Sequence, residues 1–528
     1  MKKSISNFAN KSNRRLDQLS SSTENLPNQM HAKNAPPCII RPTGLPADCL
    51  YEVFQHIEHD RQTLYSCILV NRLWCESAIE SFWKNPFRFG LNSSIINTYT
   101  MCLGEDEKTS LVDEGVILPN CEKGPTFNYA DILQHISLKK IYAAVDLWLQ
   151  RTQNFMSLTK DHDLNVLICS LLSNHFWAHC DLICSLSLDW EYIERSENHL
   201  SFFNNQRTNS RLNELRELSI HEIVDWDACR LLARSTTNIR KLQIIDYALK
   251  DEVGEKEYEV LATLIGRQTT LKHLKFFAYG QCPLPALLSI ESQIKSLVHV
   301  ELIHWNFPPE TPENTFAGLA RCHALEILII KNCRFPNDQI LAPLASASYP
   351  KLRKLWFKGL FSNEYSTFDS IIRINSTSLR HILYEDDANT PDFDHPPLET
   401  MADYCPHVRT LGIPYRNGHE DHLIDFLNKS THLKSLKLFG PYGDEREFVE
   451  RLFELAPLFP QTLRHLNLDI EWLTPENLKE FLGRVTAPLS IFYISGWKFY
   501  FNRDIFDIIY ECIRCDKVIG DVMVEIFN

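Results

Sequence analysis

Apolar residues recur along most of the chain at a regular spacing, and this pattern predicts repeated short strands. The motif is apolar-x-x-apolar-x-apolar, as in LRELSI and LKSLKL. Eleven copies begin at Leu215, Ile239, Leu271, Leu297, Leu325, Leu352, Leu379, Val408, Leu433, Leu463 and Leu489, and ICSLSL at Ile183 fits as a twelfth. Ten intervals separate Leu215 from Leu489, so the copies lie 27.4 residues apart on average. So regular a spacing indicates internal repeats.

The segments between these motifs have the pattern of amphipathic helices. In TPENLKEFLGRV, Thr474 suits the N-cap and Pro475 the first helical position, while one face carries Leu478, Phe481 and Leu482. The segment EREFVERLFEL, after Gly443, repeats the pattern. The sequence therefore predicts an α/β solenoid of strand-helix repeats over residues 181–528, in which each repeat buries its apolar face on its neighbours.

This region resembles the leucine-rich repeat proteins over roughly 300 residues, since their repeats of 20–29 residues also pair a short strand with a helix. That family often places Asn or Cys three positions after the third apolar residue. Only Cys333 clearly does so here, and Trp305 and Leu360 occupy the position in other repeats. The repeats are therefore irregular and closer to the long, cysteine-containing class.

A second pattern, in residues 45–83, predicts three short amphipathic helices. In LPADCLYEVFQHI, Pro46 suits the first helical turn, and one stripe is formed by Leu50, Val53, Phe54 and Ile57. Asp60 and Asn71 suit the N-caps of the next two helices, and Pro86 ends the third. These helices carry more apolar residues than they can bury among themselves, so we expect the repeat region or a partner protein to cover the rest.

The same residues resemble an F-box over about 43 residues, with Leu45-Pro46 at the start, an acidic break, and VNRLW from Val70 to Trp74. An F-box before leucine-rich repeats is similar to the substrate receptors of SCF-type ubiquitin ligases. The resemblance implies docking on a Skp-type adaptor, and through it on a cullin scaffold, while the repeats hold a protein substrate for ubiquitination. It assigns the adaptor contact to Leu45, Pro46, Leu50, Phe54, Ile57, Leu64, Val70 and Trp74. Alternatively, these helices cap the solenoid, although residues 128–150 could do so instead.

The pattern divides the chain into five parts. We expect a disordered tail at 1–40, the F-box at 41–90, an irregular connector at 91–125, a helical cap region at 126–180, and the solenoid at 181–528. In the cap region, one helical side carries Ile132, Ile136, Ile141, Val145 and Leu149.

Composition narrows the function. The 528 residues carry a net charge of −13, which argues against nucleic acid as the main partner because phosphate-driven binding needs a basic face. We find no apolar run long enough for a membrane span and no secretory signal, so we expect no membrane partner and a location in the cytoplasm, the nucleus or both.

Candidate chemistry is sparse. The sixteen cysteines are irregularly spaced and suit reduced thiols, and Cys512 and Cys515 lack a second CxxC. His175 and His179 could chelate zinc from one helical face, with Cys169, Cys180 and Cys184 nearby, but intervening leucines and a tryptophan favour an ordinary helix. The chain has neither a phosphate-binding loop nor a G-x-S-x-G motif. We therefore expect a non-catalytic protein without metal or cofactor; a repeat scaffold or inhibitor acting without a ligase is the alternative.

Side chains between the buried positions of each strand should face the concave surface of the solenoid. In the middle repeats these positions predict a substrate site at His273, Lys275, Phe277, His299, Lys354, Trp356, Lys358 and His381. Cations around one aromatic ring suit an acidic or phosphorylated segment with an apolar anchor. Histidine protonation should then strengthen binding in mild acid. The alternative is that these residues are simply solvated.

Overall fold

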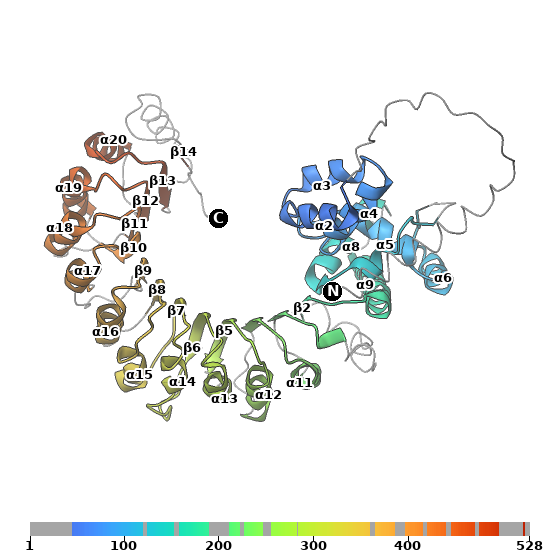
Figure 1. Ribbon diagram of the computed structural model, residues 1–528, viewed down its shortest axis with the longest axis horizontal. Coiled ribbons are helices and arrows are strands. Elements are labelled where there is room, and N and C mark those ends of the chain that lie inside the picture. Colours follow the sequence, from blue (N-terminus) through green and yellow to red (C-terminus); the bar gives the residue numbers. More distant parts are fainter. Residues whose placement is uncertain are drawn as a thin grey trace, which may run out of the picture.

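The protein, studied as a computed structural model, is an open arc of parallel strands backed by helices (Figure 1). The structure describes residues 45–119, 124–152, 158–189, 211–221, 226–246, 255–281, 284–359, 365–385, 397–415, 420–439, 445–469, 475–495 and 521–522. The expected tail at 1–40, the adjoining start of the F-box range at 41–44, and Cys512 and Cys515 lie outside these residues.

One 14-stranded sheet runs through the arc, with its strands hydrogen-bonded in chain order and parallel. Each of the twelve predicted motifs forms a strand that begins two residues after the motif does. The strands are β1 (His135–Ser137), β2 (Ser185–Asp189), β3 (Glu217–His221), β4 (Lys241–Asp246), β5 (His273–Gln281), β6 (His299–Asn306), β7 (Ile327–Lys331), β8 (Lys354–Lys358), β9 (His381–Glu385), β10 (Thr410–Pro414), β11 (Ser435–Phe439), β12 (His465–Asp469), β13 (Ile491–Ser495) and β14 (Asp521–Val522). The prediction of an α/β solenoid of leucine-rich repeat type is thereby confirmed.

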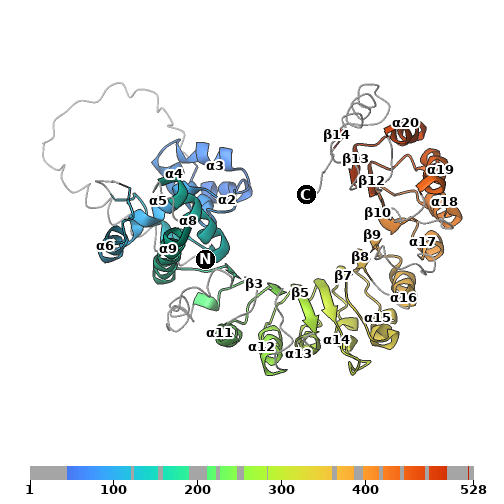
Figure 2. The same ribbon diagram turned by 180° about the vertical axis from the view of Figure 1, so that it is seen from behind.

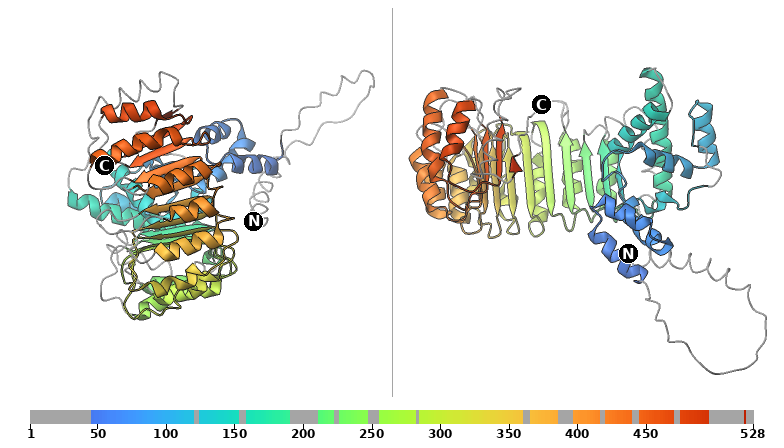
Figure 3. Two further views of the ribbon diagram at one scale, coloured as in Figure 1. Left: turned by 90° about the vertical axis from the view of Figure 1, so that its left-hand side faces the viewer. Right: turned by 90° about the horizontal axis from the view of Figure 1, so that it is seen from above.

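Helices cover the outer side of the sheet, and the strands line the inner side (Figures 1 and 2). Those of the repeats are α11 (Trp226–Ser235), α12 (Glu255–Gly266), α13 (Leu284–Leu288), α14 (Ala317–Ala320), α15 (Ala342–Ala345), α16 (Tyr365–Asn375), α17 (Leu398–Tyr404), α18 (Glu420–Lys429), α19 (Glu445–Leu455) and α20 (Pro475–Arg484). Short 3-10 turns complete three repeats at Ser289–Gln293, Asp338–Leu341 and Ala456–Leu458. Figure 3 shows the strands side by side and the helices stacked behind them.

The core is the layer between strands and helices. The apolar motif positions point into it: Leu355 and Phe357 of β8 are fully buried, as are Leu478 and Phe481 of α20, which were predicted to line one helix face. Alternation along β8 leaves its other side chains half-buried on the inner side. Apolar side chains therefore fill this layer because they recur every two residues along the strands and about every 3.6 residues along the helices.

Buried amide side chains at the ends of helices link neighbouring repeats. Asn375 Nδ2 donates to the carbonyls of Ala347 and Ile371, and Asn375 Oδ1 accepts from the backbone N–H of Tyr349. Gln268 and Gln293 do the same between other repeats. These side chains satisfy backbone groups inside the core, where an unpaired group is costly. The thiol of Cys333 likewise donates to the Leu302 carbonyl, at 3.6 Å.

The N-terminal part differs from the expected division. The sheet begins before residue 181, because β1 pairs with β2. The predicted irregular connector at 91–125 instead contains two helices, α5 (Ser93–Cys102) and α6 (Glu105–Asp113). Asn92 caps α5, and its Ile96 and Tyr99 are fully buried. Tertiary packing overrides the weak helical pattern of this segment.

The cap region at 126–180 holds α7 (Tyr129–Ile132), α8 (Leu138–Thr152) and α9 (Leu158–His179) around β1. Ile141, Val145 and Leu149 form the buried side of α8 as predicted. Ile132 and Ile136, however, belong to α7 and β1, so the expected single helical side is divided among three elements.

The predicted N-terminal helices are α2 (Ala47–His56), α3 (Arg61–Ile68) and α4 (Arg72–Trp83), and Asp60 and Asn71 cap the last two. Their own small core consists of Leu50, Phe54, Leu64, Cys67 and Ala78. The opposite side of α4 packs on the main core through Ile79 and Trp83. Trp83 contacts Tyr129 with ring centroids 4.2 Å apart. Helix α4 therefore joins the helical unit to the end of the solenoid.

Candidate functional site

Exposed apolar side chains are concentrated in residues 45–73, on and beside α2–α4. We call this group the apolar face; its members are Leu45, Val53, Tyr65, Leu69, Val70 and Leu73. The side chains of Leu69 and Val70, between α3 and α4, are 68% and 56% exposed. The solenoid thus covers only some of the apolar residues that the three helices cannot bury among themselves, namely those of α4 that pack on the main core. A concentration of exposed apolar side chains is typical of a region that another protein covers.

The predicted adaptor residues divide into two groups. Leu50, Phe54 and Leu64 are buried inside the helical unit, where they support its shape. Ile57 and Trp74 are half-buried, with the Trp74 ring 5.5 Å from that of Phe54. Leu45, Pro46 and Val70 are exposed. The predicted adaptor set omitted four residues of the apolar face, Val53, Tyr65, Leu69 and Leu73. Periodicity identifies apolar positions, as it did for Val53, but it does not show which of them lack a neighbour in the fold.

An ion cluster fixes the turn after α2 to the segment after α4. The carboxylate of Glu58 pairs with Lys84, and its Oε1 accepts a hydrogen bond from Arg88 at 3.0 Å. Burial alone raises the pKa of Glu58, but the hydrogen bonds and charges of Lys84 and Arg88 outweigh it and lower the pKa from 4.5 to about 2. The Lys84 carbonyl also accepts from the backbone N–H groups of Gln134 and His135. This cluster holds α2–α4 against the first strand of the sheet.

The second predicted site lies on the inner side of β5–β9, where register places its residues in three rows. One row runs His273, His299, Ile327, Lys354 and His381; the next runs Lys275, Glu301, Ile329, Trp356 and Leu383; the third runs Phe277, Ile303, Lys331, Lys358 and Glu385. All eight predicted residues therefore lie within the five neighbouring strands β5–β9, although β7 carries none of them. The sequence prediction did not include Glu301, Lys331 and Glu385, which share these rows.

The two glutamates neutralise much of the predicted positive charge. His299 Nε2 lies 2.8 Å from Glu301 Oε1, and Lys275 Nζ lies 3.7 Å from Glu301 Oε2. The contact with His299 outweighs burial and lowers the pKa of Glu301. Lys358 Nζ lies 2.9 Å from Glu385 Oε2. The predicted group of cations around Trp356 thus also contains two carboxylates, Glu301 on β6 and Glu385 on β9.

Two lysines stand over the ring of Trp356. Lys331 Nζ lies 3.0 Å from the ring centroid and Lys354 Nζ 5.0 Å from it. Within the described part of the chain, neither ammonium has a carboxylate within ion-pair distance. Burial, aided by Lys358 and Lys354, outweighs Glu385 and Glu301 and lowers the pKa of Lys331 from 10.5 to about 8. The ammonium is therefore held in a partly desolvated position.

Two of the predicted histidines differ electrostatically from expectation. Burial lowers the pKa of both His273 and His381, and neighbouring cations lower it further. His381 Nδ1 also lies 2.9 Å from the hydroxyl oxygen of Thr410. These two rings stay neutral to a lower pH than an exposed imidazole, so any gain in binding from their protonation is displaced to lower pH.

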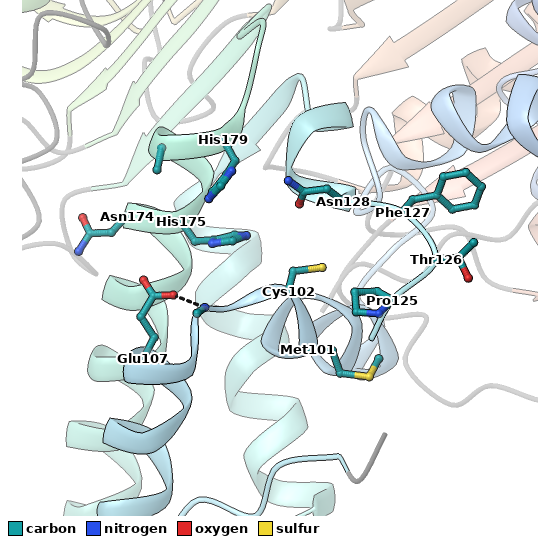
Figure 4. Close-up of a pocket in the computed structure, with 12 residues that line it drawn as sticks. Met101, Cys102, Glu107, Pro125, Thr126, Phe127, Asn128, Asn174, His175 and His179 are labelled. Atoms are coloured by element: carbon teal, nitrogen blue, oxygen red, sulfur yellow. Dashed lines mark hydrogen bonds between the residues drawn. The ribbon is translucent and has the colours of Figure 1, made fainter. Parts of the chain in front are cut away.

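A pocket of about 680 Å³ lies between α5, α6, α9 and residues 125–128 (Figure 4). His175 and His179 point into it from α9 with ring centroids 4.4 Å apart, on the same side as Cys102. Burial and the nearby His179 lower the pKa of His175 to about 4, and burial raises the pKa of the Cys102 thiol. No group of three or more His, Cys, Asp or Glu among the described residues is arranged to hold a metal ion.

Comparison with known proteins finds no protein family whose sequence model matches the chain, and no curated protein that matches it. Seventy-one chains of solved structures match. One is the leucine-rich repeat-containing protein LegL7 from Legionella pneumophila, with 11% identity and a TM-score of 0.31 over 64% of this chain and 93% of that one. Another is the TLR13–ssRNA13 complex, with 14% identity and a TM-score of 0.30 over 60% of this chain and about half (51%) of that one.

No helix in the described ranges combines the length and apolar character needed to cross a membrane.

Proposed function

We propose that this protein is the substrate-recognition subunit of an SCF-type ubiquitin ligase. In this proposal α2–α4 dock on a Skp-type adaptor, and through it on a cullin scaffold, while the inner side of the sheet holds a protein substrate. The chain itself performs no chemistry, because bringing a substrate close to a charged enzyme is enough to accelerate transfer. Such complexes operate in the cytoplasm and the nucleus, where we place the protein.

The apolar face is the observation that carries the proposal. The helical unit has its own core and a fixed attachment through Glu58 and Trp83, yet Leu69, Val70 and Leu73 stay exposed on it. Burying one such side chain contributes on the order of 1.5–3 kcal/mol. The attachment to the solenoid leaves these residues uncovered. A role as a solenoid cap alone therefore does not explain why they are apolar. An adaptor would cover it.

The test measures adaptor affinity of the full chain by calorimetry. Leu69→Asp and Val70→Asp should each weaken binding about tenfold or more, because each places a charge in a buried apolar contact. Val112→Asp is the matched control, since Val112 is 55% exposed on α6, away from the apolar face. Wild-type affinity in both face variants, with unchanged circular dichroism, would contradict adaptor docking at this face.

The alternative is a leucine-rich repeat scaffold that acts without a ligase. The parallel sheet with its open inner side supports this coarser role equally well. The same experiment separates the two: a folded wild-type chain that binds no Skp-type adaptor at micromolar concentration is a scaffold, and the apolar face then has another partner.

A further inference from the structure

The charges on the inner side of the sheet leave one point that lacks a counter-ion. Lys275 and His299 face Glu301, and Lys358 faces Glu385. Between these pairs, Lys331 and Lys354 converge on Trp356, and neither has an ion-pair partner in the described residues. We call Lys331, Lys354 and Trp356 the lysine–tryptophan site. It is a local positive charge in a chain whose net charge is −13.

Partial desolvation makes this site costly without a ligand. Lys331 is half-buried against the indole, and its surroundings favour the neutral amine. The Nε1 donor of Trp356 is covered and has no acceptor in the described parts of the chain. An anion would bring a negative charge within contact distance of the two ammonium groups, and its oxygens would accept their hydrogen bonds. Hydrogen bonds between ionised partners are about twice as strong as neutral ones.

The surroundings of the site select the kind of anion. Glu301 on β6 shares the row of Trp356, and Glu385 on β9 shares the row of Lys331. The two carboxylates therefore flank β7 and β8 and would repel a continuous phosphate backbone. Ile327 pairs with Lys354, and Leu383 pairs with Trp356, and both are half-buried. One localised negative group, flanked by apolar residues, fits this arrangement. A nucleic acid does not.

We propose that the lysine–tryptophan site binds a single anionic side chain, a phosphoryl group or a carboxylate, of an extended protein segment. This inference names the substrate class of the proposed receptor and rests on that function for its biological meaning. Trp356 and the neighbouring Ile327 and Leu383 contact the apolar part of the segment. Glu301 and Glu385 disfavour further acidic residues beside the central one.

The experiment uses the full chain without adaptor and three peptide libraries with random flanks and a fixed central phosphoserine, glutamate or serine. The phosphoserine or glutamate library should be retained over the serine library, and whichever is retained identifies the source of the anion. Lys331→Met/Lys354→Met should reduce that retention about tenfold or more. Lys437→Met is the matched control, because Lys437 lies over Phe439 on β11 at 4.3 Å and outside the site.

Equal retention of all three libraries would overturn the proposal, as would undiminished retention by the folded double variant. A single-stranded oligonucleotide that binds more tightly than any library, with binding lost in the double variant, would assign the site to nucleic acid instead. Adaptor affinity is measured separately on the same variants. Failure of peptide binding therefore leaves the adaptor result intact, and the reverse holds as well.

Discussion

At the residue scale, Glu58 connects the helical unit to the rest of the molecule through charge. Its side chain is 19% exposed and pairs with Lys84 and Arg88, which come from beyond α4. A carboxylate whose pKa is lowered in the folded state stabilises that state above its unfolded pKa. The contribution is lost as the pH falls through the folded pKa.

We therefore predict an acid-sensitive attachment of α2–α4. The contribution of Glu58 should be complete above about pH 4.5 and should disappear as the pH falls to about 2. Because solvent screens this partly exposed cluster, we expect the contribution to be on the order of 1 kcal/mol. Glu58→Gln should remove most of it at pH 7, measured by hydrogen exchange of the α2–α4 amides. Glu52→Gln, on an exposed side chain of α2, is the control. Identical exchange in both variants would show that the cluster does not hold the unit.

At the element scale, three successive repeats have a positive φ at equivalent positions, inside β6 and directly after β7 and β8. His304, Asn332 and Gly359 have φ values of 62°, 51° and 62°. Asn332 Nδ2 lies 3.0 Å from His304 Nε2, so neighbouring turns contact one another directly. A Cβ at Gly359 would lie 2.5 Å from Asn332 Oδ1. Glycine is needed at this turn for both its φ value and its lack of a side chain.

Gly359→Ala should lower the free energy of unfolding by about 1–2 kcal/mol, since it adds left-handed strain to a steric conflict. In the background Asn332→Gly, the same substitution should cost only the strain, about 1 kcal/mol. Urea unfolding of the wild type, the two single variants and the double variant gives the coupling free energy between the two turns. Strictly additive effects would mean that the turns act independently and that the close approach is relieved elsewhere.

The sequence predicted elements well where neighbours repeat one another. All twelve strand motifs and the α19 and α20 helices follow from local pattern, because each repeat meets the same environment. Helices α5 and α6, and the early start of the sheet at β1, did not follow. Their formation depends on contacts such as that of Tyr99 with Phe176, at 4.6 Å, which join distant segments. The lysine–tryptophan site was predicted only in part. Lys331 was omitted although it shares a row with the predicted Phe277 and Lys358, and the ion pairs of Glu301 and Glu385 with residues of neighbouring strands cannot be read from the repeat pattern.

At the scale of the whole molecule, the two proposed binding surfaces occupy different parts of the arc. The apolar face is on α2–α4 at one end, and β7 and β8 lie in its middle (Figure 1). The elements between them form one continuous core and sheet. In a solenoid each repeat contacts mainly its neighbours, so a local substitution changes its surroundings and not the far end. Free-energy effects at separate sites without shared partners usually add.

We therefore predict that the two binding functions are energetically independent and jointly required for ubiquitination. Leu69→Asp should weaken adaptor binding and leave retention of the acidic peptide library unchanged. Lys331→Met/Lys354→Met should do the reverse. In a reconstituted ligase, with a selected peptide fused to a folded carrier as substrate, either change should reduce ubiquitin transfer about tenfold or more, because transfer needs both tethers at once. Val112→Asp and Lys437→Met should leave it unchanged.

Full transfer by a variant that has lost peptide binding would show that the substrate is held elsewhere. A change in peptide affinity on adding adaptor would show instead that the two ends of the arc are coupled.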